Sequence, residues 1–101
     1  MQTALLSPHE IATRLANLNA AGVEPWVLRD NALHKTFRFA DFSAAFGFMT
    51  RAALAAERLN HHPDWSNAWN RVAVSLSTHD AGGITALDFL LAQEMETLAD
   101  G

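Results

Sequence analysis

Apolar residues recur at helical spacing near the start of the chain, at Ile11, Leu15 and Leu18. A Ser-Pro-His-Glu stretch precedes them. It provides a capping serine, a proline at the first helical position and a glutamate that can reach back to the cap amide. Gly22 can close such a helix in a left-handed conformation. The pattern predicts a helix over 7–21.

Two later stretches alternate between apolar and polar residues, as strands with one buried face do. Over 33–39 the apolar or long side chains occupy the odd positions, and the turn-forming pair Asp-Asn at 30–31 separates this stretch from a short apolar run. Over 72–77 valine and leucine occupy the even positions, and an asparagine turn separates this stretch from 65–69. Each pair of segments predicts a β-hairpin.

Helical spacing returns in two further segments. Asp41 can cap the first of them, which is expected to run to about Leu59. Its core-facing stripe is expected to contain Phe42, Phe46, Met49, Ala53 and Ala56. After two glycines, Thr85 and Asp88 have the spacing of a capping pair and predict the start of a last helix.

The predicted element order is αββαββα. Two hairpins and three helices in a chain of 101 residues predict an α+β fold, with a four-stranded antiparallel sheet and the three helices packed on one face. No linker or repeat divides the chain, so a single domain over 1–101 is expected. The uncovered face and the outer strands favour self-pairing, and a homo-oligomer, dimer or tetramer, is therefore expected.

The amino-acid composition excludes several kinds of catalytic site and partner. The chain has no cysteine, which excludes thiolate nucleophiles, redox dithiols and cysteine-ligated metal centres. A formal net charge of -4 offers no electrostatic footprint for phosphates, so direct nucleic-acid binding is not expected. No signal-peptide pattern or run of about 20 apolar residues occurs, which favours a cytoplasmic protein without a membrane partner.

Three histidines carry the strongest chemical signal. His61 and His62 stand side by side before Pro63, and His79 follows the second predicted hairpin. Pro63 favours an extended conformation at His62, in which successive side chains diverge. The two imidazoles are therefore poorly arranged to chelate one ion together, although they can also be simply solvated loop residues.

A metal site would need to recruit His79, Glu57 or Asp88. None of the strong ligand spacings is present, so neither a metal nor another cofactor is expected. The chain also lacks a Gly-x-Ser-x-Gly elbow and a glycine-rich phosphate loop. Clustered histidines suit acid-base chemistry such as a dehydration, because one imidazole can accept a proton while another gives one.

These residues resemble the signature of the pterin-4a-carbinolamine dehydratases. The resemblance lies in ERLNHHP at 57–63, Trp69, LSTH at 76–79 and Asp88, and in FSAAFGFMTR at 42–51. It implies the same fold, a small-molecule pterin substrate and an enzyme that removes water from 4a-hydroxytetrahydropterin to give quinonoid dihydropterin. Such an enzyme serves aromatic amino-acid hydroxylases and needs no cofactor.

By this resemblance the catalytic residues are His61, His62 and His79, with His62 and His79 nearest the proton transfers. Residues expected to bind substrate or shape its pocket are Glu57, Pro63, Ser77, Thr78 and Asp88. Glu57 can orient an imidazole one helical turn away, or it is an exposed helix charge. Asp88 can act at the site, cap its helix, or do both.

Two departures from the family pattern leave roles open. Asn60 stands where family members often have an acidic residue, and Trp26 comes later than the tryptophan expected after the first helix. Two further functions stay as alternatives. One is a protein-binding regulatory module, because animal members of the resembled family also act as dimerisation partners of a transcription factor. The other is a pterin-binding module without turnover.

Overall fold

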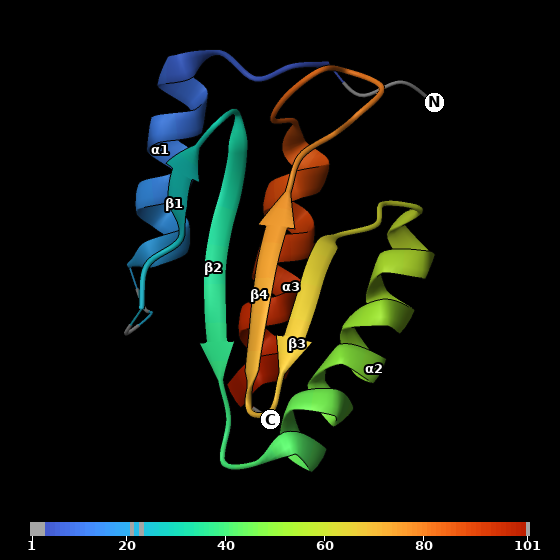
Figure 1. Ribbon diagram of the computed structural model, residues 1–101. Helices are drawn as coiled ribbons and strands as arrows, with labels where there is room; N and C mark the ends of the chain where they lie inside the picture. Colours follow the sequence, from blue (N-terminus) through green and yellow to red (C-terminus); the bar gives the residue numbers. More distant parts are fainter. Residues whose placement is uncertain (1–3, 21, 23, 101) are drawn as a thin grey trace.

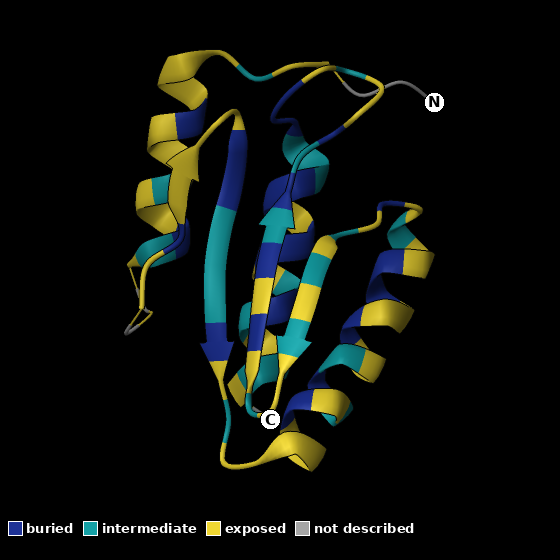
Figure 2. Cartoon of the chain, viewed as in Figure 1, coloured by how far each residue is buried: buried dark blue, intermediate teal, exposed yellow. Residues whose placement is uncertain are grey.

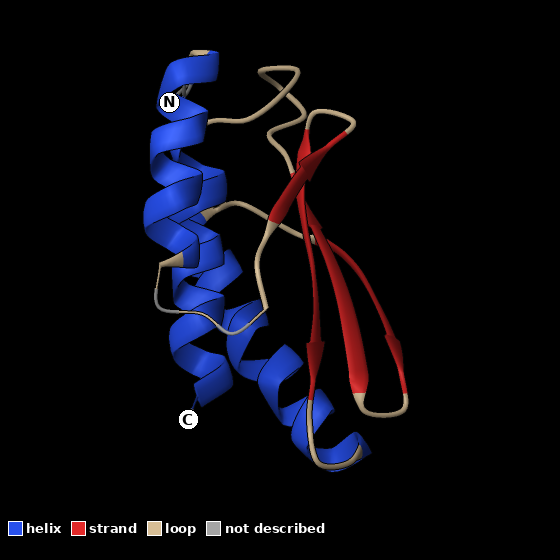
Figure 3. Ribbon diagram, turned by 90° about the vertical axis from the view of Figure 1, so that its left-hand side faces the viewer, coloured by secondary structure: helices blue, strands red, loops and turns tan. Residues whose placement is uncertain are grey.

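The computed structural model describes residues 4–20, 22 and 24–100, and within them the chain folds into one sheet covered by helices on one side (Figures 1 and 3). The predicted order αββαββα is confirmed. The helices are α1 (Pro8–Asn19), α2 (Phe42–Leu59) and α3 (Ala86–Asp100). The strands are β1 (Val27–Arg29), β2 (Ala32–Arg38), β3 (Asp64–Ala68) and β4 (Arg71–Leu76).

The four strands form an antiparallel sheet in the order β1-β2-β4-β3. The turn of the first hairpin contains Asp30 and Asn31, both with positive φ, as a two-residue turn between twisted strands requires. Val72, Val74 and Leu76 of β4 are buried, while Ala73 is exposed, so the predicted alternation is confirmed (Figure 2). This alternation turns one face of the sheet towards the helices.

Capping fixes the start of each helix. The Ser7 hydroxyl accepts from the Glu10 amide at 3.1 Å and the Glu10 carboxylate accepts from the Ser7 amide at 2.9 Å, so α1 begins with the predicted capping box. The Ala44 amide donates to Asp41 at the start of α2. The predicted end of the first helix at Ala21 lies outside the described residues, and α1 ends at Asn19.

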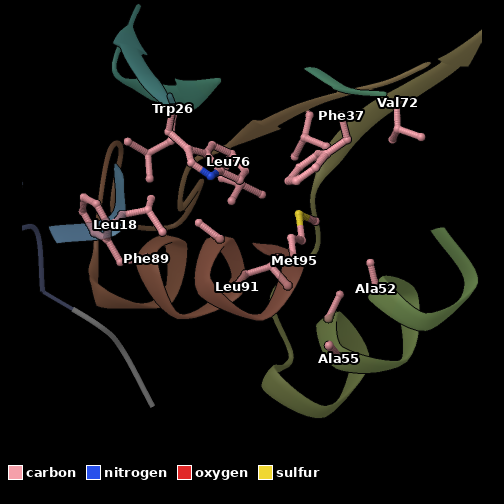
Figure 4. Packing of buried hydrophobic residues seen from close by; sticks show 14 of the residues in the cluster. Leu18, Trp26, Phe37, Ala52, Ala55, Val72, Leu76, Phe89, Leu91 and Met95 are labelled. Carbon is pink, nitrogen blue, oxygen red and sulfur yellow. The ribbon is translucent and has the colours of Figure 1, made fainter. Parts of the chain in front are cut away.

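The core lies between the sheet and the helices (Figure 4). Trp26, Phe37 and Leu76 reach it from the sheet side, and Leu91 and Met95 reach it from α3. The ring centroids of Trp26 and Phe37 are 5.7 Å apart in an edge-on arrangement, which aromatic quadrupoles favour. A core of this kind holds the ends of the strands, and the loops that follow them, in fixed positions.

The buried side of α2 differs from the prediction. Phe42 and Phe46 are 52% and 54% exposed, so the expectation that they face the core is wrong. The residues of α2 that are buried are Ala45, Phe48, Ala52, Ala55 and Ala56. Small side chains let a helix approach its neighbour closely, and α2 packs mainly against α3 through this alanine-rich side.

Candidate active site

A pocket of about 650 Å³ opens where the α2–β3 loop meets the β4–α3 loop. Both loops lie at the same end of the sheet, because β3 begins where its antiparallel neighbour β4 ends (Figure 1). The volume falls within the range of roughly 300–1,000 Å³ that small-molecule sites occupy. The residues that line the pocket are Asn60, His61, His62, Pro63, Asp64, Ser77, Thr78, His79, Asp80, Ala81 and Leu87.

Asn60 turns the chain out of α2 and towards this pocket. It has φ 51° and ψ 44°, a left-handed conformation that asparagine adopts more readily than most residues. Its amide donates to the Glu57 carbonyl at 3.1 Å, and the next amide, that of His61, donates to the Ala56 carbonyl at 3.0 Å. These two hydrogen bonds form a Schellman ending. Asn60 thus ends α2 through its backbone conformation, and it also lines the pocket.

A hydrogen bond to Asp88 holds the imidazole of His61 in place. Nε2 of His61 lies 2.6 Å from Oδ1 of Asp88, and their side chains are 8% and 0% exposed. The other carboxylate oxygen, Oδ2, accepts from the Thr85 amide at 2.8 Å and from the Thr78 hydroxyl at 2.9 Å. The predicted capping pair therefore exists, and Asp88 both caps α3 and orients an imidazole.

The other two histidines are open to solvent and lie near carboxylates of their own. Nε2 of His62 is 3.2 Å from Oε1 of Glu57, and Nε2 of His79 is 3.5 Å from Oδ2 of Asp64. The imidazoles are 64% and 76% exposed, so these contacts orient the rings more than they stabilise the fold. All three histidines of the pocket thus have a carboxylate within reach, which favours particular ring orientations and tautomers.

The predicted substrate residues divide into two groups. Pro63, Ser77 and Thr78 line the pocket itself. Glu57 and Asp88 do not line it, and each instead contacts one of the histidines that do. Each predicted residue thus either lines this cavity or contacts a histidine that lines it.

Trp26 lies elsewhere. Its side chain is buried in the core, and its indole N–H donates to Oε2 of Glu96 at 2.9 Å. The role of Trp26, which the sequence left open, is therefore in the core, and Trp26 does not line the pocket.

Asp64 and Thr85 are site residues that sequence reasoning missed. Asp64 follows the His-His-Pro stretch directly, and this acidic neighbour was the available signal. Thr85 was identified only as a helix cap. Its hydroxyl oxygen is also 2.7 Å from that of Thr78, which requires the two ends of the β4–α3 loop to meet. Such a contact between loop ends depends on the tertiary fold.

The site contains hydrogen-bonding and acid-base groups. Within the described ranges, no three His, Cys, Asp or Glu side chains gather closely enough to hold a metal ion. None of the helices there is long and apolar enough to cross a membrane. Imidazoles that line a pocket of this size can transfer protons to and from a small-molecule ligand.

Comparisons with known proteins point to one family. Residues 4–98 match the family model described as Pterin 4 alpha carbinolamine dehydratase. Two relatives whose names include pterin-4-alpha-carbinolamine dehydratase come from Solibacter usitatus and Rhizobium johnstonii. The first is 50% identical over 99 residues, which are 98% of this chain and 99% of the relative. The second is 62% identical over 76 residues, which are 73% of this chain and 75% of the relative.

A solved structure is similar in both fold and sequence. It is described as the crystal structure of a transcriptional coactivator/pterin dehydratase from Brucella melitensis. The TM-score is 0.81 at 45% sequence identity, and the match covers 93% of this chain and 97% of that chain. The similarity therefore extends over most of both chains.

Proposed function

The chain belongs to the pterin-4-alpha-carbinolamine dehydratase family of hydro-lyases, and from that premise we propose that its pocket converts a 4a-hydroxytetrahydropterin to quinonoid dihydropterin and water. The observation that carries the proposal is the convergence of His61, His62 and His79 on one pocket from two separate loops. This reaction recycles the pterin cofactor that aromatic amino-acid hydroxylases consume.

The reaction requires one acid and one base. The bond between C4a and its hydroxyl oxygen breaks, and the hydroxyl leaves as water after it receives a proton. The N5–H bond also breaks, its electron pair forms the double bond between N5 and C4a, and the base takes the proton. No electron enters or leaves, so two imidazoles in opposite protonation states complete the chemistry.

His62 and His79 carry these proton transfers in the proposal, one as acid and the other as base. Their imidazoles are 64% and 76% exposed beside the pocket, so a bound pterin can reach them. His61 is nearly buried and is fixed by Asp88, which suits a group that hydrogen-bonds and orients the pterin. Pro63 fixes the loop, and Ser77 offers polar groups to the edge of the pterin ring. Thr78 also lines the pocket, but its polar groups are engaged in hydrogen bonds within the protein.

The test measures the decay of 4a-hydroxytetrahydropterin produced in situ by a hydroxylase. We expect the wild-type protein to accelerate the decay, and His62→Ala and His79→Ala each to lower kcat/KM by about 10²-fold or more. His9→Ala is the matched control, because His9 is exposed on α1 outside the pocket. A wild-type protein that binds a dihydropterin but leaves the decay rate unchanged would be a pterin-binding module without turnover.

A second candidate function is binding of a regulatory protein partner. The Brucella melitensis structure is described as a transcriptional coactivator as well as a pterin dehydratase, and this description favours the idea. Apolar side chains on the surface, among them Phe42, Phe46 and Leu54, offer contact area for a protein. A pulldown that returned only copies of this chain would count against a second protein.

We also propose that the chain forms a homo-oligomer. In the part of the chain that the structure describes, β3 pairs with β4 alone, so its outer edge has free backbone groups that can pair with another copy. Light scattering coupled to size-exclusion chromatography tests this directly. A monomer at micromolar concentration would overturn the proposal.

A further inference from the structure

A buried polar network lies behind the pocket. The buried polar or charged residues within the described ranges are His61, Thr78, Thr85 and Asp88, which are 7%, 8%, 0% and 0% exposed. All four are joined by hydrogen bonds into one network. Because burying polar groups is costly unless they are paired, a network of this kind is sensitive to the loss of one member.

The hydrogen bonds in this network have a definite direction. The Thr85 hydroxyl oxygen accepts from the Leu87 amide at 3.2 Å, and the Thr78 hydroxyl donates to Oδ2 of Asp88 at 2.9 Å. A hydroxyl has one proton, so Thr78 must accept in its 2.7 Å contact with Thr85. The order is therefore from the Leu87 amide through Thr85 and Thr78 to the carboxylate.

This direction determines the tautomer of His61. Oδ2 of Asp88 already accepts from the Thr78 hydroxyl and the Thr85 amide, as a carboxylate oxygen does. Oδ1 then accepts from Nε2–H of His61 at 2.6 Å. In the neutral ring Nδ1 is left as the nitrogen without a proton, available to accept a hydrogen bond from a ligand.

Thr85 also closes the loop that carries His79. Thr78 and Thr85 stand at the two ends of this loop, and their hydroxyls meet across its base. The Thr78 amide donates to the Gly83 carbonyl at 2.8 Å, and the Gly82 amide donates to the Thr78 carbonyl at 2.9 Å. The hydroxyl pair thus ties the position of His79 to the network that holds His61.

From these contacts we infer that Thr85, although it does not line the pocket, is a positioning residue whose hydroxyl fixes the Nε2–H tautomer of His61 through Thr78 and Asp88. The inference rests on the proposed function for its effect on turnover. Its effect on the imidazole does not depend on that function. A role as helix cap alone would lower stability without changing the tautomer.

The test compares Thr85→Val, which removes the hydroxyl at nearly constant shape, with Thr85→Ser, which keeps it. We expect the valine variant to lower kcat about fivefold to tenfold, as the loss of one hydrogen bond implies, with KM within about twofold. The ¹⁵N signals of His61 should shift from the Nε2–H tautomer to a mixture. Thr85→Ser should match the wild type in both measurements.

A control separates this effect from the loss of a cap. Asp41→Ala removes the cap of α2 at the end of that helix remote from His61, and it should lower stability while leaving the His61 signals unchanged. If Thr85→Val fails to fold, Thr85→Ala replaces it, because it also lacks the hydroxyl and introduces no methyl groups against Thr78.

The possible results distinguish a failure of this inference from a failure of the proposed function. Wild-type kcat and wild-type ¹⁵N signals in a folded variant without the hydroxyl would overturn the inference, as would a serine variant as impaired as the valine variant. An inactive wild-type protein would overturn the proposed function. The His61 signals would then still decide the role of Thr85.

Discussion

Nε2 of His61 and Oδ1 of Asp88 are 2.6 Å apart, although 27 residues of sequence separate them. Both side chains are buried, and the contact joins the end of α2 to the first turn of α3. A carboxylate in this position can accept from three donors at once, namely His61, Thr78 and the Thr85 amide. Replacing it therefore affects both the fold and the site.

Asp88→Asn should impair turnover and stability together. An amide has two donor hydrogens in place of a carboxylate oxygen, so one of them must face His61, Thr78 or the Thr85 amide. We expect kcat to fall by about 10²-fold and the free energy of unfolding to fall by about 1–3 kcal/mol. Stopped-flow assays and urea unfolding measure the two quantities. A folded variant with wild-type kcat would show that Asp88 has no part in turnover.

Asn60 should tolerate glycine better than alanine. Its left-handed φ of 51° costs an alanine about 1–2 kcal/mol, whereas glycine adopts it freely. We expect Asn60→Ala to lower the free energy of unfolding by about 1 kcal/mol and Asn60→Gly to leave it nearly unchanged. Urea unfolding of both variants provides the comparison. Equal losses in the two would show that the asparagine side chain, and not the backbone conformation, is what matters there.

The part-buried Lys35–Glu96 ion pair should contribute to stability, because each partner has already lost most of its contact with water. Nζ of Lys35 is 2.5 Å from Oε2 of Glu96, and the side chains are 7% and 20% exposed. The same oxygen accepts from the Trp26 indole. Glu96→Ala leaves a buried ammonium without its partner, so the free energy of unfolding should fall by about 3 kcal/mol.

A second variant checks the physical reason. Combining Lys35→Met with Glu96→Ala removes the unpaired charge, and the double variant should be more stable than Glu96→Ala alone. Chemical denaturation of the wild type, both single variants and the double variant completes the cycle. Additive losses would mean that the two side chains do not interact.

The sequence predicted the elements because each pattern reflects a buried face. Val72, Val74 and Leu76 alternate with small or polar residues, and this alternation holds in the folded sheet. The hydrophobic pattern could not predict in the same way which side of α2 faces the core. Phe46 is more hydrophobic than Ala52, yet close packing on α3 selects the alanine, and only the tertiary arrangement determines that choice.

The sequence indicated which residues form the site, but not which carboxylate contacts which histidine. His61, His62 and Pro63 are adjacent in the sequence, so their motif is visible at once. Glu57 lies one helical turn before His61, but its carboxylate contacts His62. The short buried contact is instead made by Asp88, whose distance from His61 depends on how α3 packs against α2.

The capping box of α1 should make stability depend on acid pH. The hydrogen bond from the Ser7 amide is the main cause that lowers the pKa of Glu10 below its ordinary value. A lowered folded pKa means that the stabilisation is present above the unfolded glutamate pKa of about 4.3 and is lost as the pH falls through the folded value. Glu10→Gln should therefore flatten this part of the profile of Tm against pH. Ser7→Ala removes the hydroxyl but keeps the amide at position 7, so it should flatten the profile less. Thermal unfolding followed by circular dichroism between about pH 6 and pH 3 covers the window in which glutamate titrates. A Gln variant whose Tm falls as steeply as that of the wild type would assign the acid sensitivity to other carboxylates.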